Sequence, residues 1–99
     1  MRLTKTQQLI IKQKTALVFG DMARVYLFGS RINDEAKGGD IDLFIESTAP
    51  IENAVLKSLQ LNSQLQQAFG LQKIDIIFHA PNYAWQSIHS IAKQQGILL

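Results

Sequence analysis

The sequence predicts an α/β (α+β) fold, in which a small mixed β-sheet of three or more strands is flanked by helices. Segments whose apolar residues recur at helical spacing alternate with short, continuous apolar runs that are typical of buried strands. Their order along the chain is helix, strand, short helix, strand, helix, strand, helix. The 99 residues, 46% hydrophobic and 18% charged, are expected to form one globular domain that spans residues 1–99.

The first half of the chain is predicted to contain one long helix and two strands. The helix covers residues 3–19 and stops at Gly20. Its apolar stripe repeats at seven-residue spacing and consists of Leu3, Ile10 and Leu17 with Ile11 and Val18. The run Val25–Phe28 predicts a buried strand, residues 30–35 a short helical turn, and residues 40–46 a second strand.

The second half begins with a loop over residues 47–50, where Ser47 or Thr48 is expected to cap the next helix and Pro50 to occupy its first turn. That helix is predicted over residues 51–69 and ends at Gly70. Its apolar side is expected to consist of Ile51, Val55, Leu59, Leu65 and Phe69.

The remaining residues predict one more strand and one more helix. The strand covers residues 73–78, and the helix runs from Asn82 to Gln94, before Gly96. Residues 97–99 form an apolar tail.

Two carboxylates on the second strand are the main indication of chemistry. Asp40 and Asp42 are two residues apart, so their side chains lie on the same face, whereas Ile41 points to the core. Two like charges side by side repel, and a divalent cation such as Mg²⁺, which prefers carboxylate and phosphate oxygens, would relieve that repulsion. The alternative is an exposed turn end, in which residues 38–40 cap a hairpin.

The end of the first strand carries residues suited to phosphate. Gly29 permits close approach of the backbone to a ligand, and Ser30 adds a hydroxyl donor. A helical turn that starts there would also present free amides to an anion. Arg31 could reach a phosphate, although a surface salt bridge explains it equally well, and Gly-Ser by itself is also an ordinary turn.

Asp75 supplies a third carboxylate, within the apolar strand of residues 73–78. A strand beside the second one would bring Asp75 next to Asp40 and Asp42, and three carboxylates can hold two metal ions. The alternative is that Asp75 faces solvent. Lys73 could counter this negative charge, or simply be solvated at the end of the strand.

Composition limits the other classes of function. The chain has no cysteine, which excludes disulfides and thiolate metal sites, and no apolar run as long as a membrane span. A cytoplasmic protein without a membrane partner is expected. The net charge is only +2 and the basic residues are scattered, so charge does not argue for direct binding of nucleic acid.

Taken together, these residues resemble the minimal nucleotidyltransferases of the DNA polymerase β-like superfamily. That family combines Gly-Ser, about ten further residues, Asp-x-Asp on the next strand, and one Asp on a later strand. In this chain nine residues separate Gly29-Ser30 from Asp40-Ile41-Asp42, and Asp75 follows. The resemblance covers residues 25–99 and implies the polymerase β-like nucleotidyltransferase fold.

The resemblance also implies a role for each of these residues. Gly29, Ser30 and Arg31 would bind the nucleotide, while the three aspartates would be catalytic. Asp40 and Asp42 would bind Mg²⁺, with two ions expected, and Asp75 would complete the second metal site and help to activate the acceptor hydroxyl. The substrate would be ATP.

Because larger relatives carry helical domains for which 99 residues leave no room, the chain resembles the antitoxins of HEPN–MNT toxin–antitoxin pairs. There the partner is a HEPN ribonuclease toxin, which the nucleotidyltransferase neutralises by attaching AMP to a tyrosine. Two alternatives stay open. One is an antitoxin that only binds and masks the toxin, and the other is nucleotidyl transfer to a small molecule or an RNA end.

Overall fold

A four-stranded mixed sheet forms the centre of the computed structural model, which describes residues 3–32, 40–70 and 72–99. The strands are β1 (Ala23–Phe28), β2 (Ile41–Ser47), β3 (Ile74–His79) and β4 (Ile97–Leu98), in the order β3-β2-β1-β4. β1 pairs antiparallel with β2 and with β4, whereas β2 and β3 are parallel. The predicted α/β class and mixed sheet are therefore confirmed.

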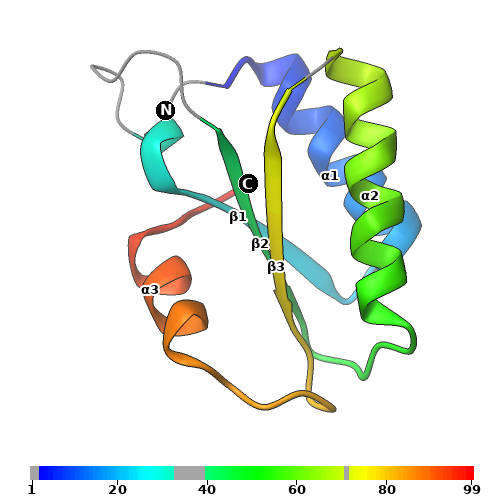
Figure 1. Cartoon of the computed structure of the whole chain (residues 1–99), viewed down its shortest axis with the longest axis vertical. Helices are drawn as coiled ribbons and strands as arrows, with labels where there is room; N and C mark the ends of the chain where they lie inside the picture. The colour runs from blue at the N-terminus through cyan, green and yellow to red at the C-terminus, as the bar shows by residue number, and fades with distance from the viewer. Residues whose placement is uncertain (1–2, 33–39, 71) are drawn as a thin grey trace.

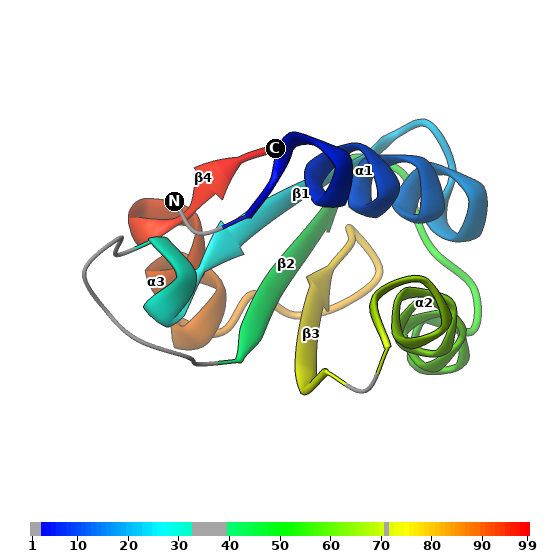
Figure 2. The same cartoon turned by 90° about the horizontal axis from the view of Figure 1, so that it is seen from above.

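Helices cover both faces of this sheet. α1 (Lys5–Phe19) and α2 (Ala54–Phe69) lie together on one face, and α3 (Ser87–Gln95) lies on the other (Figures 1 and 2). A short 3₁₀ helix, η1 (Gly29–Ile32), follows β1 directly. The result is a three-layer arrangement in which the sheet is the middle layer.

The alternation of side chains along β2 divides the core between the two faces. Ile41, Leu43 and Ile45 are buried toward the helical pair, in the larger cluster that includes Ile11 of α1 and Leu61 of α2. The intervening residues face α3, where Phe44 packs with Tyr26 and Ala92 in a smaller cluster. The face toward α3 is therefore also the face that carries Asp42.

α1 begins where a capping box forms. The Thr4 hydroxyl accepts a hydrogen bond from the Gln7 amide at 3.0 Å, and the Gln7 side chain accepts one from the Thr4 amide at 2.9 Å. The predicted stripe was wrong at Leu17, which is 72% exposed. The buried residues of the helix are Ile11, Thr15 and Phe19, at the four-residue spacing of a face that packs on one sheet.

The predicted start of α2 was wrong by three residues. Ile51 is buried outside the helix, where Asn82 receives a hydrogen bond from its amide (3.1 Å) and donates one to its carbonyl (2.9 Å). Ser47 does not cap the helix, because its hydroxyl donates to the Ala49 carbonyl at 2.7 Å. The helix starts after Asn53, whose φ is +54°, so Pro50 lies ahead of the first turn.

The buried face of α2 also differs from the prediction. Ala54, Leu61 and Leu65 are its buried residues, whereas Val55 and Leu59 are exposed. The prediction is therefore confirmed at Leu65 and at Phe69, which packs against the larger cluster, and was wrong at Val55 and Leu59.

Two amide side chains of α2 reach the outer edge of β3. Asn62 Nδ2 donates to the Ile74 carbonyl at 2.7 Å. The Gln66 amide group accepts from the backbone N–H of Gln72 at 2.9 Å and donates to the carbonyl of the same residue. These side chains satisfy backbone groups that no strand pairs with, since β3 has β2 as its one neighbour in the described sheet.

α3 begins at Ser87, five residues later than predicted, because residues 80–86 form turns and irregular structure instead of helix. His89 anchors the helix. It is 7% exposed, stacks on Phe44 at a centroid distance of 5.6 Å, and its Nδ1 accepts a hydrogen bond from the Gln86 amide at 3.0 Å. Burial, and secondarily the nearby His79, lowers the pKa of His89 below its ordinary value of 6.5.

We expect the free energy of unfolding to fall as pH drops below about 6.5, because the folded protein binds the His89 proton less tightly than the unfolded chain does. The loss should end below the lowered pKa of the folded state. Denaturant unfolding between about pH 7.5 and 4.5 should show a smaller pH dependence in His89→Gln than in the wild type. An unchanged pH dependence in His89→Gln would contradict this account.

Candidate active site

The parallel pairing of β2 with β3 places two of the three candidate carboxylates side by side. Asp42 and Asp75 are direct partners in the register, as are the buried residues Ile41 and Ile74 just before them. Since side chains alternate, both aspartates project from the face opposite to this core. Asp40 lies two residues before Asp42, at the start of the strand, so all three carboxylates belong to one end of the sheet.

The three negative charges at this end of the sheet affect the protonation of Asp42. The pKa of Asp42 is raised, first by partial burial of the carboxyl group and then by the negative charges of Asp75 and Asp40. The positive charge of Lys73 acts in the opposite direction. The ionised form of Asp42 is thus disfavoured unless additional positive charge is present.

Lys73 provides one such charge. Its Nζ lies 3.4 Å from Asp40 Oδ2, and the hydrogen bond and charge of Asp40 raise the pKa of the ammonium, with smaller contributions from Asp75 and Asp42. The sequence left the role of this lysine open. The feature of the sequence that indicates this role is the position of Lys73 two residues before Asp75, because residues at that spacing lie on the same face of a strand.

Gly29, directly after β1, lies against the Asp42 side chain. Phe28 pairs with Asp42 in the register, and the chain then turns at Gly29 with a φ of +76°. A Cβ atom at this position would lie 3.1 Å from Asp42 Cγ and 3.3 Å from Asp42 Cβ, and would collide with the carboxylate oxygen Oδ2. Only glycine lets the turn approach the carboxylate this closely.

The predicted helical turn after β1 is confirmed for Gly29–Ile32 as η1, which contains Ser30 and the partly buried Arg31. The expected continuation to Glu35 and the glycines of the alternative hairpin cap fall in residues 33–39, outside the described residues. The Ser30 side chain is also outside them. The nucleotide-binding roles of Gly29, Ser30 and Arg31 therefore stay predictions.

The chemistry of the donor set fits a hard divalent cation. Asp40, Asp42 and Asp75 offer only carboxylate oxygens, the ligands that Mg²⁺ prefers, and positive charge would offset the repulsion at Asp42. Among the described residues no three His, Asp or Glu side chains are close enough together to hold a metal ion as they stand. Asp40 is instead paired with Lys73. The metal-binding roles of the three aspartates stay predictions.

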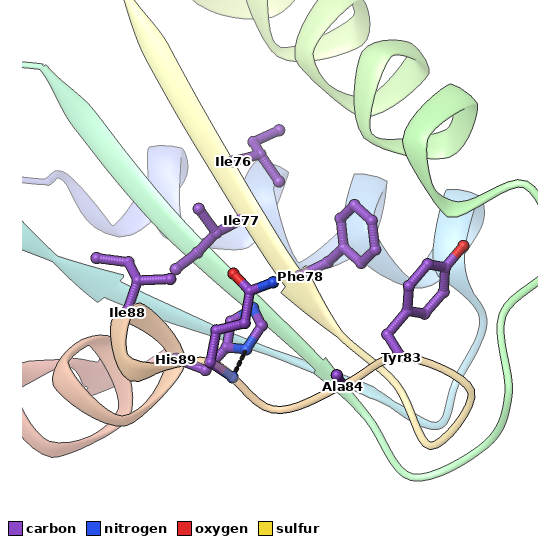
Figure 3. A pocket seen from close by; sticks show the side chains of 8 residues that line it. Ile76, Ile77, Phe78, Tyr83, Ala84, Ile88 and His89 are labelled. Carbon is purple, nitrogen blue, oxygen red and sulfur yellow. Dashed lines mark hydrogen bonds between the residues drawn. The ribbon is translucent and has the colours of Figure 1, made fainter.

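A pocket of about 300 Å³ lies between β3, the following loop and the first turn of α3 (Figure 3), and none of the three aspartates lines it. Ile77, which lies two residues after Asp75 on the same face of β3, forms one wall together with Ile88 (Figure 3). The other lining residues are Ile76, Phe78, Tyr83, Ala84, Gln86 and His89. Most of this lining is apolar, and the pocket was not predicted from the sequence.

Comparison with protein families identifies the fold. A model of the polymerase β nucleotidyltransferase domain matches residues 5–99, which is nearly the whole chain. The chain belongs to this family. The four-stranded mixed sheet with its flanking helices is consistent with the polymerase β-like fold, and membership indicates nucleotidyl transfer as the general activity. Comparison with individual curated proteins found no match.

Polymerase β-like nucleotidyltransferases generally use a nucleoside triphosphate and a divalent metal ion, in agreement with the carboxylates of this site. None of the helices in residues 3–32, 40–70 and 72–99 is long and apolar enough to cross a membrane.

Proposed function

We propose that this polymerase β-like domain is a Mg²⁺-dependent nucleotidyltransferase that transfers AMP from ATP to a tyrosine of a HEPN ribonuclease toxin, and thereby acts as the antitoxin. The observation that carries the catalytic part is the register that pairs Asp42 with Asp75, next to the turn at Gly29. The choice of ATP, of tyrosine and of the toxin partner rests on the resemblance to HEPN–MNT antitoxins.

The reaction is an in-line displacement at phosphorus. The tyrosine oxygen attacks the α-phosphorus of ATP, an O–P bond forms, and the bond from the α-phosphorus to the bridging oxygen breaks, so that pyrophosphate leaves. The hydroxyl proton passes to Asp75, which is the most exposed of the three carboxylates and therefore open to an acceptor.

The other residues bind and position the nucleotide. The backbone of η1 at Gly29 and Ser30 holds the phosphates, since Gly29 carries no Cβ that would block their approach to Asp42. Asp40, Asp42 and Asp75 would hold two Mg²⁺ ions, which supply neutralisation of the charge on the phosphates. Most of the catalytic effect therefore comes from positioning and charge neutralisation.

The pocket between β3 and α3, whose lining begins at Ile76, the residue after Asp75, is where we place the tyrosine-bearing segment of the partner. Its apolar walls suit an aromatic ring, and Ile77 sets the pocket on the same face of β3 as the proposed base. β3 lies at one edge of the described sheet, so no further strand separates it from a second protein that approaches from that side.

The experiment is transfer of label from α-labelled ATP, with Mg²⁺, to the co-expressed toxin. The wild type should label one protein, γ-labelled ATP should label none, and Asp75→Asn should lower the rate by about 10²–10³-fold, the range expected for loss of a catalytic proton acceptor. Absence of labelling despite ATP binding and a folded chain would overturn the proposed acceptor. Labelling from γ-labelled ATP but not from α-labelled ATP would show phosphate rather than AMP transfer.

Ile88→Glu should test the acceptor pocket. Ile88 lines the pocket and is 42% exposed, so a carboxylate there should remain solvated while it repels an aromatic side chain. Toxin labelling should fall about tenfold, with ATP binding unchanged. Ile91→Glu is the matched control, because Ile91 is 46% exposed on the same helix and does not line the pocket. Equal effects of the two variants would argue against acceptor binding in this pocket.

A further inference from the structure

An ion pair links Lys73 to Asp40, which forms the carboxylate cluster together with Asp42 and Asp75. The ammonium Nζ lies 3.4 Å from Asp40 Oδ2, while 71% of the lysine side chain is exposed. The lysine precedes β3 directly, and its backbone carbonyl accepts a hydrogen bond from the Ile41 amide at 3.1 Å. The base of the side chain is therefore fixed beside β2, whereas most of the side chain is exposed to solvent.

We propose that Lys73 is an internal counter-cation that competes with the divalent metal ion for Asp40, and that this competition sets the metal affinity of the site. The proposal rests on the proposed function, because it takes the three aspartates as the metal site. It assigns a positioning role to a residue outside that set of aspartates.

The two cations compete because binding both of them at one carboxylate oxygen would place two positive charges close together. A Mg²⁺ ion lies about 2.1 Å from an oxygen ligand, so an ion and an ammonium on the same oxygen would be at most about 5.5 Å apart. Their charges repel at that separation. The flexible, exposed lysine can leave more easily than the ion can lose a ligand, so metal binding should include breakage of the pair between Lys73 and Asp40.

The chain contains a matched pair for comparison. Lys93 Nζ lies 2.9 Å from Glu46 Oε2, and Glu46 lies on the same face of β2 as Asp42, four residues further along. That distance along a strand is about 13 Å, beyond the Debye length at physiological salt. Removal of the Lys93 charge should thus leave the carboxylate cluster almost unaffected.

The experiment measures Mn²⁺ binding by the electron paramagnetic resonance signal of the free ion, at about 0.15 M KCl and without nucleotide. Lys73→Gln should bind Mn²⁺ about threefold to tenfold more tightly than the wild type, and the gain should shrink at about 0.5 M KCl. Lys73→Arg, which keeps the charge, should stay within about twofold of the wild type, as should Lys93→Gln.

The outcomes separate this inference from the function on which it depends. Equal or weaker Mn²⁺ binding by Lys73→Gln, with wild-type binding abolished by Asp42→Asn, would overturn the role of Lys73 and leave the metal site intact. Absence of Mn²⁺ binding in the folded wild type and in Lys73→Gln would overturn both the inference and the proposed metal site. A gain in Lys93→Gln as large as in Lys73→Gln would show a general charge effect and overturn the inference.

Discussion

Asp42→Asn is expected to lower nucleotidyl transfer about 10³-fold and, in metal-free buffer, to raise the melting temperature. Asparagine has the shape of aspartate but no charge, so it removes a ligand for the cation without removing the packing against Gly29. The loss of activity corresponds to the removal of charge stabilisation at the reacting phosphate.

The gain in stability follows from the raised pKa of Asp42. Partial burial and the charges of Asp75 and Asp40 disfavour the carboxylate in the folded protein, and this penalty is present at neutral pH. Because the group is partly exposed, we expect a gain of only about 0.5 kcal/mol, or 2–4 °C in melting temperature.

Thermal unfolding with and without Mg²⁺ measures this effect. Mg²⁺ should stabilise the wild type, and should stabilise Asp42→Asn far less, since a ligand stabilises only the state that binds it. Asp21→Asn is the control, because Asp21 is exposed in the turn after α1. A lower melting temperature for Asp42→Asn, or retained transfer, would contradict the account of the site.

Gly29→Ala should damage both stability and activity. The substitution places a Cβ against Asp42 and imposes a positive φ on an L-residue, each of which costs about 1–2 kcal/mol. Together they should lower the melting temperature by about 8–16 °C. At temperatures below the unfolding transition, the rate of nucleotidyl transfer should fall at least about tenfold. The reason is that the added Cβ displaces the Asp42 carboxylate from its catalytic position.

A double-mutant cycle separates the collision from the backbone strain. In an Asp42→Ala background the carboxylate is absent, so Gly29→Ala should cost about 1 kcal/mol less than in the wild type. Gly70→Ala is a further control, since Gly70 has a φ of +80° and no atom within 4 Å of the added Cβ. Additive effects at positions 29 and 42 would show that the close approach has no energetic consequence.

The sequence predicted the order of the elements well, because helical and strand periodicities depend on short-range alternation. It could not place the first turn of α2, where Ile51 is held by Asn82 from a distant loop rather than by helical bonds. Nor could it identify the whole buried side of α2, since the exposed Val55 and Leu59 are as apolar as Leu65, which packs. Long-range contacts decided both cases.

In the candidate site, too, local features could be predicted from the sequence, whereas long-range contacts could not. Spacing alone indicated that Asp40 and Asp42 share a face, but their proximity to Asp75 depended on a parallel neighbour, which single-sequence periodicity does not reveal. The close approach of Gly29 to Asp42 and the pairing of Lys73 with Asp40 also required the register. The pocket between β3 and α3 combines residues from β3, a loop and α3, so no local pattern could predict it.

The amide side chains of α2 at β3 have a consequence for self-association. A sheet edge with unpaired backbone groups can recruit a strand from another copy of the chain and start aggregation. Asn62 and Gln66 occupy backbone groups at Ile74 and Gln72, where such a strand would begin to pair. The protein thus blocks the start of its own outermost strand with uncharged side chains, adding no further charge beside its carboxylates.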